Sequence, residues 1–336
     1  MDLTRFPRVA LGHCPTPLER MDRLRAALGA ASPTLYVKRD DCSGLATGGN
    51  KTRKLEFLMG AARAQGAGAI VTFGALQSNH ARQTAAAAAK LGLPCDLILI
   101  DRVPGRDAAY RESGNVLLDR LLGARVHVVA PDRPAQELRE IVAANERAGL
   151  STYVVPVGGS NATGALGYAA AFDEIAAQAH ALGIRIDALV HGSSSGGTQA
   201  GLVAGTTISD SATRILGVNV YKPSGSDIEQ EVRALARETV QLLGGDDGAV
   251  AARVEVIDGY QGEAYGIPSA PMGEAVELAA RTEGLLLDPV YSGKAMAALI
   301  GGVRDRRFTR EQTIVFVHTG GTAALLRQEK IPVKDV

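Results

Sequence analysis

Residues 48–56 read GGNKTRKLE, and they follow the segment YVKRDD at residues 36–41. The earlier segment has the pattern of a strand that ends in a charged turn, and the glycine pair predicts a second turn that leads into a helix. This helix should have one buried face, because apolar residues recur at helical spacing at Leu55, Leu58, Met59 and Ala62. A strand that leads through a glycine turn into a half-buried helix is typical of an α/β fold.

The same alternation continues along the rest of the chain. Short apolar runs predict strands at Thr34–Val37, Ala69–Phe73, Asp96–Ile100, Val126–Val129, Thr152–Val155, Ala188–His191, Ile215–Tyr221 and Thr313–Val317. Helical patterns lie between them at Lys51–Gln65, Ala81–Leu91, Gly114–Leu122, Ala135–Ala148, Ala162–Leu182 and Ile228–Leu243. Because continuously apolar strands are typical of sheets that helices cover on both faces, we expect mainly parallel sheets.

The composition excludes several classes of protein. A length of 336 residues suits two domains, and 46% hydrophobic with 21% charged residues is typical of globular proteins. The 36 basic and 36 acidic side chains balance, so we expect no nucleic-acid and no membrane partner. No apolar run resembles a signal peptide or a membrane span, and three cysteines without a C-x-x-C pair indicate neither a disulfide framework nor a zinc site. We therefore expect a cytoplasmic protein with no metal.

Lys51 and Lys54 both fall in the first turn of the helix that follows the glycine pair. Two cations are unfavourable there, because the helix dipole and the unpaired N–H groups favour an anion. The conflict is resolved if one lysine is bonded as an imine and the other faces a phosphate. A nearby positive charge and burial both lower the pKa of a lysine, which favours the neutral amine that Schiff-base formation needs.

Two polar loops follow predicted strands. The first contains Gln77, Ser78, Asn79 and His80, and its serine and asparagine suit a helix N-cap as well as a site for a substrate carboxylate. The second reads SSSGGTQAG at residues 193–201, and its small residues let backbone N–H groups approach a phosphate. It does not match G-x-G-x-x-G, and no acidic ribose partner follows about 20 residues later, which argues against a nicotinamide dehydrogenase.

These segments together resemble the fold-type II pyridoxal 5′-phosphate enzymes, whose cofactor lysine lies in a segment similar to KRDD…GGNKTRKL. The resemblance is closest to the D-cysteine desulfhydrase / 1-aminocyclopropane-1-carboxylate deaminase family, which includes L-cysteate sulfo-lyases. It extends from PTPL at residues 15–18 to HTGG at residues 318–321. It implies a tryptophan synthase β-like fold with two three-layer α/β domains and mainly parallel, twisted sheets. Residues 1–50 plus 160–336 would form a large cofactor domain, residues 51–159 a smaller inserted domain, and the chain would be a homodimer.

The resemblance also implies how the cofactor is held. Lys51 would carry pyridoxal 5′-phosphate as a Schiff base, and Asn79 would contact the 3′-oxygen of the cofactor. Thr319, which precedes Gly320 after the last predicted strand, would face the pyridine nitrogen. The phosphate would be bound by Ser195, Gly196, Gly197 and Thr198.

The substrate of the resembled family is a small amino acid, and its carboxylate would be bound by the loop from Gln77 to His80. Ser78 occupies the position of a serine proposed as nucleophile or proton-handling group. Two tyrosines beside turn residues, Tyr265 and Tyr291, would lie near the substrate amine and the leaving group. A buried tyrosine near a lysine can donate a proton, although a tyrosine beside a turn can also be a surface anchor.

The residue after Tyr291 reduces the number of candidate reactions. The deaminase branch carries a glutamate there, suited to pairing with the pyridine nitrogen, whereas this chain has Ser292. Opening a cyclopropane should need the stronger electron sink, so we expect β-elimination from a cysteine-like amino acid to pyruvate and ammonia. D-cysteine desulfhydrase activity is the first expectation. L-cysteate sulfo-lyase activity, with the sulfonate near a cation such as Lys222, ring-opening deamination and non-catalytic cofactor binding are the alternatives.

Overall fold

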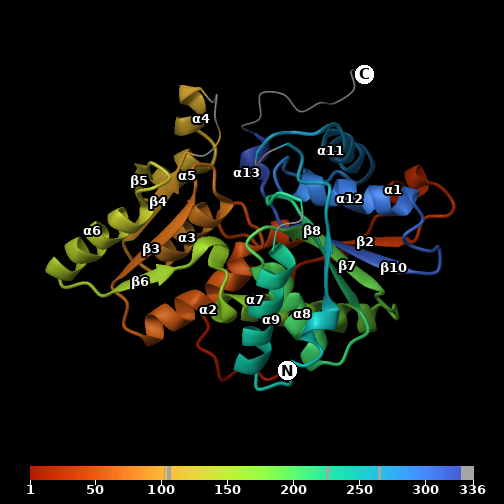
Figure 1. The fold of residues 1–336 in the computed structure, drawn as a ribbon, viewed down its shortest axis with the longest axis horizontal. Coiled ribbons are helices and arrows are strands. Elements are labelled where there is room, and N and C mark those ends of the chain that lie inside the picture. Colours follow the sequence, from red (N-terminus) through yellow and green to blue (C-terminus); the bar gives the residue numbers. More distant parts are fainter. Residues whose placement is uncertain (102, 104–106, 225–226, 264–265, 327–336) are drawn as a thin grey trace.

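The computed structural model describes residues 1–101, 103, 107–224, 227–263 and 266–326. Within this part the chain forms ten strands in two sheets (Figure 1). The strands are β1 Leu18–Arg20, β2 Thr34–Lys38, β3 Ala69–Ala75, β4 Cys95–Ile100, β5 Arg125–Val129, β6 Thr152–Val155, β7 Ala188–Ser193, β8 Arg214–Asn219, β9 Val254–Ile257 and β10 Thr313–Val317. All eight predicted strands are confirmed, with β8 shorter than expected at its carboxyl end.

The larger sheet has the strand order β1-β2-β10-β7-β8-β9, and the smaller has the order β5-β4-β3-β6. Every neighbouring pair is parallel except β1 and β2. Strand β10 lies between β2 and β7, so that Val315 is opposite Tyr36 on one side and Leu189 on the other. The carboxyl-terminal strand therefore joins the first segment of the chain to the segment that follows the smaller sheet.

The helices supply the outer layers of both sheets (Figure 1). They are α1 Asp22–Leu28, α2 Lys51–Ala64, α3 Asn79–Lys90, α4 Ala108–Glu112, α5 Asn115–Leu121, α6 Pro134–Arg147, α7 Ala162–Ala181, α8 Gly197–Ile208, α9 Ile228–Leu242, α10 Val250–Arg253, α11 Ala270–Glu283, α12 Ser292–Arg304 and α13 Thr322–Leu325, with short 3₁₀ turns η1 Asp40–Cys42 and η2 Val157–Gly159. The six predicted helices are confirmed, α3 with its start two residues earlier than expected.

Each sheet has apolar side chains packed on both faces. In the larger sheet, residues of α1, α11 and α12 form one core with Leu35, Val190 and Leu216, and residues of α7, α8 and α9 form another with Leu189 and Val315. In the smaller sheet, α2 and α3 cover one face and α6 covers the other. The expected three-layer α/β architecture is confirmed. Residues 1–50 plus 160–336 and residues 51–159 remain our proposed domain limits.

A buried ion network fixes helix α2 against helix α7. Arg53 donates from Nε and Nη2 to the two oxygens of Asp40 at 2.9 and 2.8 Å, and from Nη1 and Nη2 to the two oxygens of Glu174 at 2.9 and 2.8 Å. Lys38 adds a bond from Nζ to Glu174 at 2.5 Å. Asp40 follows β2, so this network links the end of the larger sheet to the helix that begins at Lys51.

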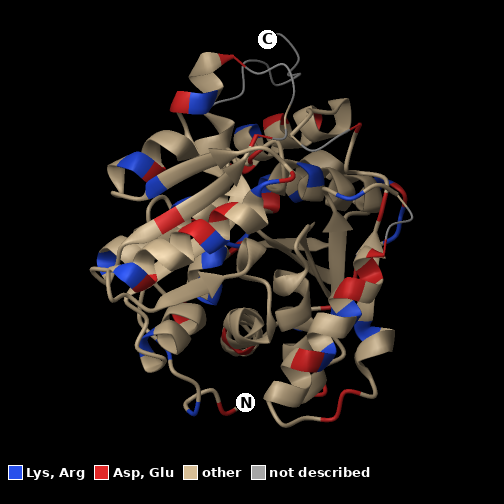
Figure 2. Ribbon diagram, turned by 60° about the vertical axis from the view of Figure 1, so that its left-hand side comes forward, with Lys and Arg blue, Asp and Glu red and all other residues tan. Residues whose placement is uncertain are grey.

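Charged residues of both signs are interspersed over both parts of the molecule (Figure 2), as the balance of 36 basic and 36 acidic residues allows. Among the described residues, no helix is both long enough and apolar enough to cross a membrane. The same part of the chain contains no group of three or more His, Cys, Asp and Glu side chains placed to hold a metal ion.

Candidate active site

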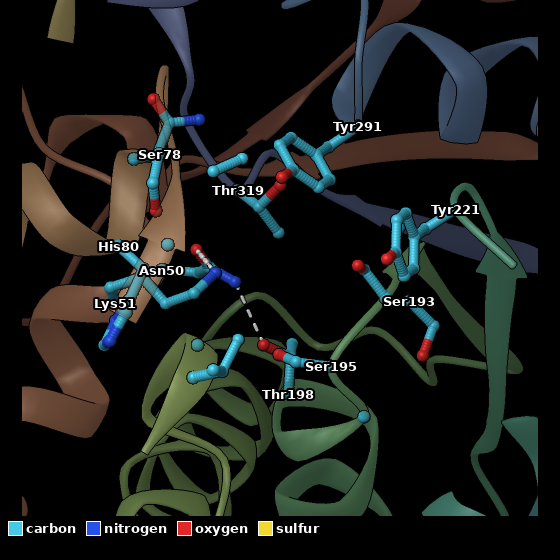
Figure 3. A pocket seen from close by; sticks show the side chains of 18 of the residues that line it. Asn50, Lys51, Ser78, His80, Ser193, Ser195, Thr198, Tyr221, Tyr291 and Thr319 are labelled. Carbon is cyan, nitrogen blue, oxygen red and sulfur yellow. Dashed lines mark hydrogen bonds between the residues drawn. The ribbon is translucent and has the colours of Figure 1, made fainter. Parts of the chain in front are cut away.

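The candidate site lies where the carboxyl ends of the two sheets meet. Ligands of open parallel sheets bind at this edge, because the loops that leave the strands converge there. The loops after β3, β6, β7, β8 and β10 enclose a cavity of about 250 Å³ (Figure 3). The lining includes Asn50, Lys51, Ser78, Asn79, His80, Gly158, Ser193, Ser195, Gly196, Thr198, Tyr221, Lys222, Tyr291, Thr319 and Gly320.

The turn before Lys51 needs its glycines. Ala46, Thr47, Gly48 and Gly49 all have positive φ, and a Cβ at Gly48 would lie 1.9 Å from the carbonyl oxygen of Asp41. Arg82 of α3 holds this turn: its Nη1 donates to the carbonyl of Ala46, to Thr47 Oγ1 at 2.7 Å and to the carbonyl of Gly48 at 3.1 Å. The backbone N–H of Asn50 then bonds to the carbonyl of Thr319 at 3.0 Å, so α2 begins beside the end of β10.

Lys51 is held in a site that favours the neutral amine. Burial, and next the charge of Arg82, lower the pKa of Lys51 to about 8. Its Nζ donates to Asn50 Oδ1 at 3.0 Å, and Asn50 Nδ2 in turn donates to Thr198 Oγ1 at 3.0 Å (Figure 3). Asn50 therefore connects the lysine to the loop that follows β7.

The loop after β7 has the shape of an anion cradle. Gly196 adopts a left-handed conformation with φ 77° as the N-cap of α8, and the Ser195 hydroxyl lies 2.8 Å from that of Ser160. A Cβ at Gly197 would lie 2.6 Å from Ser160 Oγ and 2.9 Å from Lys54 Nζ, so any larger residue would have to displace these two side chains. Ser193 Oγ is buried without a hydrogen-bond partner among the described residues, and such a donor is available to a ligand.

Lys54 lies behind this cradle and does not line the cavity. Its Nζ donates to the carbonyl of Gly158 at 3.1 Å and to Ser160 Oγ at 3.3 Å. Burial, and next the charge of Lys51, lower its pKa well below the ordinary lysine value. The two lysines lie close together, and Lys54 contacts the cradle through Ser160. Its predicted contact with a phosphate stays a prediction.

Three of the four residues predicted in the loop after β3 line the cavity. Ser78 caps α3 by accepting from the N–H of Ala81 at 3.1 Å, and with Asn79 it lines the cavity. His80 also lines it, but its Nε2 lies 2.8 Å from Thr72 Oγ1, and burial keeps its pKa well below the usual value.

Gln77 has a different place from the one predicted. Its side chain does not reach the cavity, because Nε2 donates to the carbonyls of Tyr110 at 2.6 Å and Ser113 at 2.9 Å. The side chain therefore holds the segment around α4 and α5, and a contact with the substrate carboxylate is not supported for it.

Tyr291 points into the cavity from the turn before α12 (Figure 3). This turn is built around Asp288, which is fully buried and accepts at Oδ1 from the N–H groups of Val290 and Tyr291 at 2.8 and 2.7 Å. The Ser292 hydroxyl donates to Asp288 Oδ2 at 2.6 Å. Ser292 is therefore part of the support for Tyr291 and does not line the cavity. Tyr265, the other predicted tyrosine, lies outside the described residues.

Among the residues of the cavity that sequence reasoning did not assign a role are Asn50, Ser193 and Tyr221. Asn50 precedes Lys51 and links it to Thr198, whereas Tyr221 and Ser193 lie across the cavity from Lys51 (Figure 3). The position of Asn50 inside GGNKTRKLE was the available signal. For Tyr221, only its place at the end of a predicted strand could have indicated it.

A family model described as "Pyridoxal-phosphate dependent enzyme" matches residues 9–320, which is most of the chain. The chain belongs to the pyridoxal-phosphate-dependent enzyme family. D-cysteine desulfhydrases of Klebsiella pneumoniae subsp. pneumoniae and Serratia proteamaculans are 45% and 44% identical to it; the alignments cover 96% of this chain and 97% and 96% of those proteins.

Solved structures agree with this assignment. A crystal structure of an ACC deaminase homologue has a TM-score of 0.84 and 35% sequence identity over 96% of this chain and 94% of that one. A pyridoxal 5′-phosphate-dependent aspartate racemase, at 17% identity over 94% of this chain and 92% of that one, shares the fold with a TM-score of 0.66.

The cavity of this pyridoxal-phosphate-dependent enzyme fits its cofactor. Lys51 offers an amine with a lowered pKa for the cofactor aldehyde, and the glycine cradle with Ser195 and Thr198 offers space and hydroxyl donors for a phosphate. Thr319 offers a neutral hydroxyl at the end of β10 for the pyridine nitrogen. These assignments of single residues remain our proposals.

The lowered pKa of Lys51 should appear in the rate at which the apoenzyme takes up its cofactor. Only the neutral amine attacks an aldehyde, so the rate of appearance of visible absorbance should rise about tenfold from pH 6 to pH 7 and level off above about pH 8. The control is N-acetyl-lysine with pyridoxal phosphate over the same pH range, which corrects for titration of the cofactor. A rate that still rises about tenfold per unit between pH 9 and pH 10 would contradict burial of Lys51.

Proposed function

We infer that this enzyme is a carbon–sulfur lyase that eliminates sulfide from D-cysteine, and that pyruvate and ammonia are formed after hydrolysis. The observation that carries this inference is the 45% identity to a D-cysteine desulfhydrase over 96% of this chain. The absence of the glutamate after Tyr291 is consistent with it, because Ser292 is engaged with Asp288 and offers no acid to a ring nitrogen.

We assign a separate role in a β-elimination to each of several residues around the cavity. When bound, pyridoxal phosphate withdraws electrons from the substrate Cα, so that a base can remove the proton there. We propose that the Lys51 amine is the base that removes this proton. We assign the substrate carboxylate to the N-terminus of α3 at Ser78 and Asn79, where the helix dipole favours an anion. The Tyr291 hydroxyl donates a proton to the leaving sulfur, and the Ser78 hydroxyl positions the substrate.

The charge around Lys222 favours a thiol over a sulfonate as the leaving group. Lys222 lines the cavity, as a sulfonate site would require, but its Nζ is paired with Glu231 Oε1, and Glu231 also lines the cavity. A sulfonate would have to compete with this carboxylate for the ammonium and would be repelled by it. A thiol leaving group does not need the Lys222 ammonium.

Two expectations from the sequence belong to this proposal. We propose that the enzyme acts in the cytoplasm on a small amino acid, where its thiol and sulfide chemistry is kept reduced. We also propose that it is a homodimer, as the members of the resembled family usually are. Size-exclusion chromatography with light scattering checks the oligomeric state.

The substrate assignment is tested with holoenzyme given D-cysteine, L-cysteine, L-cysteate or 1-aminocyclopropane-1-carboxylate in parallel. Pyruvate and sulfide should appear in equal amounts from D-cysteine, with kcat/KM at least about tenfold above that for each other compound, a difference of about 1.4 kcal/mol between transition states. Sulfite from L-cysteate as the main product would assign a sulfo-lyase. Turnover of the cyclopropane alone would overturn the argument from Ser292.

A further inference from the structure

Asn115, the first residue of α5, is fully buried against the loop after β3. Its Nδ2 donates to the carbonyl oxygen of Gln77 and to Asn79 Oδ1, both at 2.9 Å. Its backbone N–H donates to Gln77 Oε1 at 2.8 Å. One residue of α5 therefore contacts both the backbone and the side chains of the loop that borders the cavity.

The orientation of the Asn79 amide follows from these contacts. A backbone carbonyl can only accept, so the Asn115 atom that faces Gln77 must be the NH₂ group. This NH₂ group can only donate, and the Asn79 atom that faces it must therefore be Oδ1. Gln77 is fixed in the same way by the carbonyls of Tyr110 and Ser113. The acceptor of Asn79 is thus used within the protein, and its donor faces elsewhere.

The free donor of Asn79 belongs to the cavity. Asn79 lines the cavity, and within the described part of the chain its Nδ2 has no protein acceptor. Its backbone carbonyl accepts from Gln83 Nε2 at 3.1 Å, and Gln83 Oε1 accepts from the N–H of Thr52 at 3.0 Å. Asn79 is therefore linked through one side chain to the residue next to Lys51.

Only the NH₂ end of the Asn115 side-chain amide has hydrogen-bond partners among the described residues. Its Oδ1 is buried without a hydrogen-bond partner among the described residues, and such an orphaned polar atom normally lowers stability. A buried amide of this kind is explained if its NH₂ group is needed to orient a neighbour. The donor is used twice, and both bonds fix the loop after β3.

We propose that Asn115 is a positioning residue that makes Asn79 a hydrogen-bond donor to an anionic oxygen of the bound molecules. Two such oxygens exist in this enzyme, the ring oxygen of pyridoxal phosphate and the carboxylate of the substrate. The inference rests on cofactor binding at Lys51, and it does not depend on which group leaves the substrate.

The variants Asn115→Ala and Asn79→Ala test this proposal, together with the double variant. Each single change should raise the Kd of the apoenzyme for pyridoxal phosphate about 10- to 100-fold, as expected for a lost bond to a charged oxygen. The two variants should also shift the pH titration of the visible spectrum in the same direction as each other. The double variant should be no worse than Asn79→Ala, because both changes remove the same contact. If the oxygen is the substrate carboxylate, the spectrum and the cofactor Kd stay unchanged and KM rises in all three.

Asn145→Ala is the matched control for burial. Asn145 is a buried asparagine of α6 that bonds to Thr152 Oγ1 at 3.1 Å and does not line the cavity. Its replacement should lower Tm and leave the spectrum, the cofactor Kd and KM unchanged. If Asn115→Ala behaves like this control, or if its effects add to those of Asn79→Ala, the proposal is overturned.

Asn79→Asp tests the same idea without disturbing Asn115. Aspartate keeps an oxygen toward Asn115 Nδ2 and replaces the NH₂ group that faces the cavity by a second oxygen. Its affinity for pyridoxal phosphate, or for substrate, should therefore fall at least as much as that of Asn79→Ala. Wild-type values for both Kd and KM in this variant would overturn the proposal, even if Asn115→Ala fails to fold.

Discussion

Lys51→Ala should reduce sulfide release from D-cysteine by on the order of 10⁴-fold, the upper range for loss of one acid–base group. The variant loses both the amine that bonds the cofactor aldehyde and the base that we assign to the Cα proton. The neighbouring Lys54 cannot replace it, because its Nζ is held by Gly158 and Ser160 behind the phosphate cradle. Sulfide and the visible spectrum are measured on the same preparation.

Lys90→Ala is the control for Lys51→Ala. Lys90 ends α3, is exposed, and bonds to the carbonyl of Leu11 at 3.0 Å, away from the cavity. This variant should keep the visible spectrum and the rate of the unchanged enzyme. A Lys51→Ala protein that keeps the spectrum of the lysine-bound cofactor would show that another lysine holds it.

Arg53→Ala should lower the free energy of unfolding by about 3–5 kcal/mol, as expected when one partner of a buried ion pair is removed. Arg53 is 2% exposed, and its loss leaves Asp40 and Glu174 without their four bonds from the guanidinium. Because α2 is held to α7 by this group, cofactor affinity should fall as well. Urea unfolding of the holoenzyme measures the change.

Arg304→Ala is the matched control for Arg53→Ala, because its pair with Glu274 is about half exposed on both sides. It should cost no more than about 1 kcal/mol. Equal losses in the two variants would contradict a structural role for the buried network.

The same network should resist mild acid. Burial raises the pKa of Glu174, but bonds and charges from Arg53 and Lys38 outweigh this effect and lower it to about 2. The stabilisation by Glu174 is therefore complete above the ordinary value of 4.5 and is lost as the pH falls toward 2.

The strands and helices that carry strong local patterns can be predicted from the sequence. Most of β2, β4 and β10 is buried and apolar, β3 begins with buried apolar residues, and the glycine turn before Lys51 is visible as GGNK. The short strands β1 and β9 cannot be predicted in this way. β1 has three residues, of which Glu19 and Arg20 are exposed, and its pairing with β2 forms only through tertiary contact.

Helix α8 shows how packing overrides local preference. It contains Gly197, Gly201 and Gly205, which lower helix propensity. A Cβ at Gly201 would lie 2.2 Å from the carbonyl oxygen of Ala165, and one at Gly205 would lie 2.6 Å from Phe172 Cβ. These glycines let α8 approach α7 closely, which no pattern within α8 alone indicates.

The candidate site could be predicted only where its residues lie in local sequence motifs. Ser78, Asn79 and Thr319 lie in short motifs just after strands, where chemistry is expected. Lys51 and Tyr291 lie in turns that lead into helices α2 and α12. The link from Lys51 through Asn50 to Thr198 joins residues 148 positions apart and depends on how the two sheets meet. The sequence predicts a contact between the Gln77 side chain and the substrate, whereas its bonds to Tyr110 and Ser113 depend on the position of α4, which the sequence does not fix.

The central claim is that Lys51 carries the cofactor, and one measurement tests it directly. The holoenzyme is reduced with borohydride, which makes the bond between lysine and pyridoxal phosphate permanent, then digested and mapped by mass spectrometry. We expect the added mass on Lys51 alone. The same mass on a buried lysine, Lys38, Lys54 or Lys294, or on none, would contradict the claim.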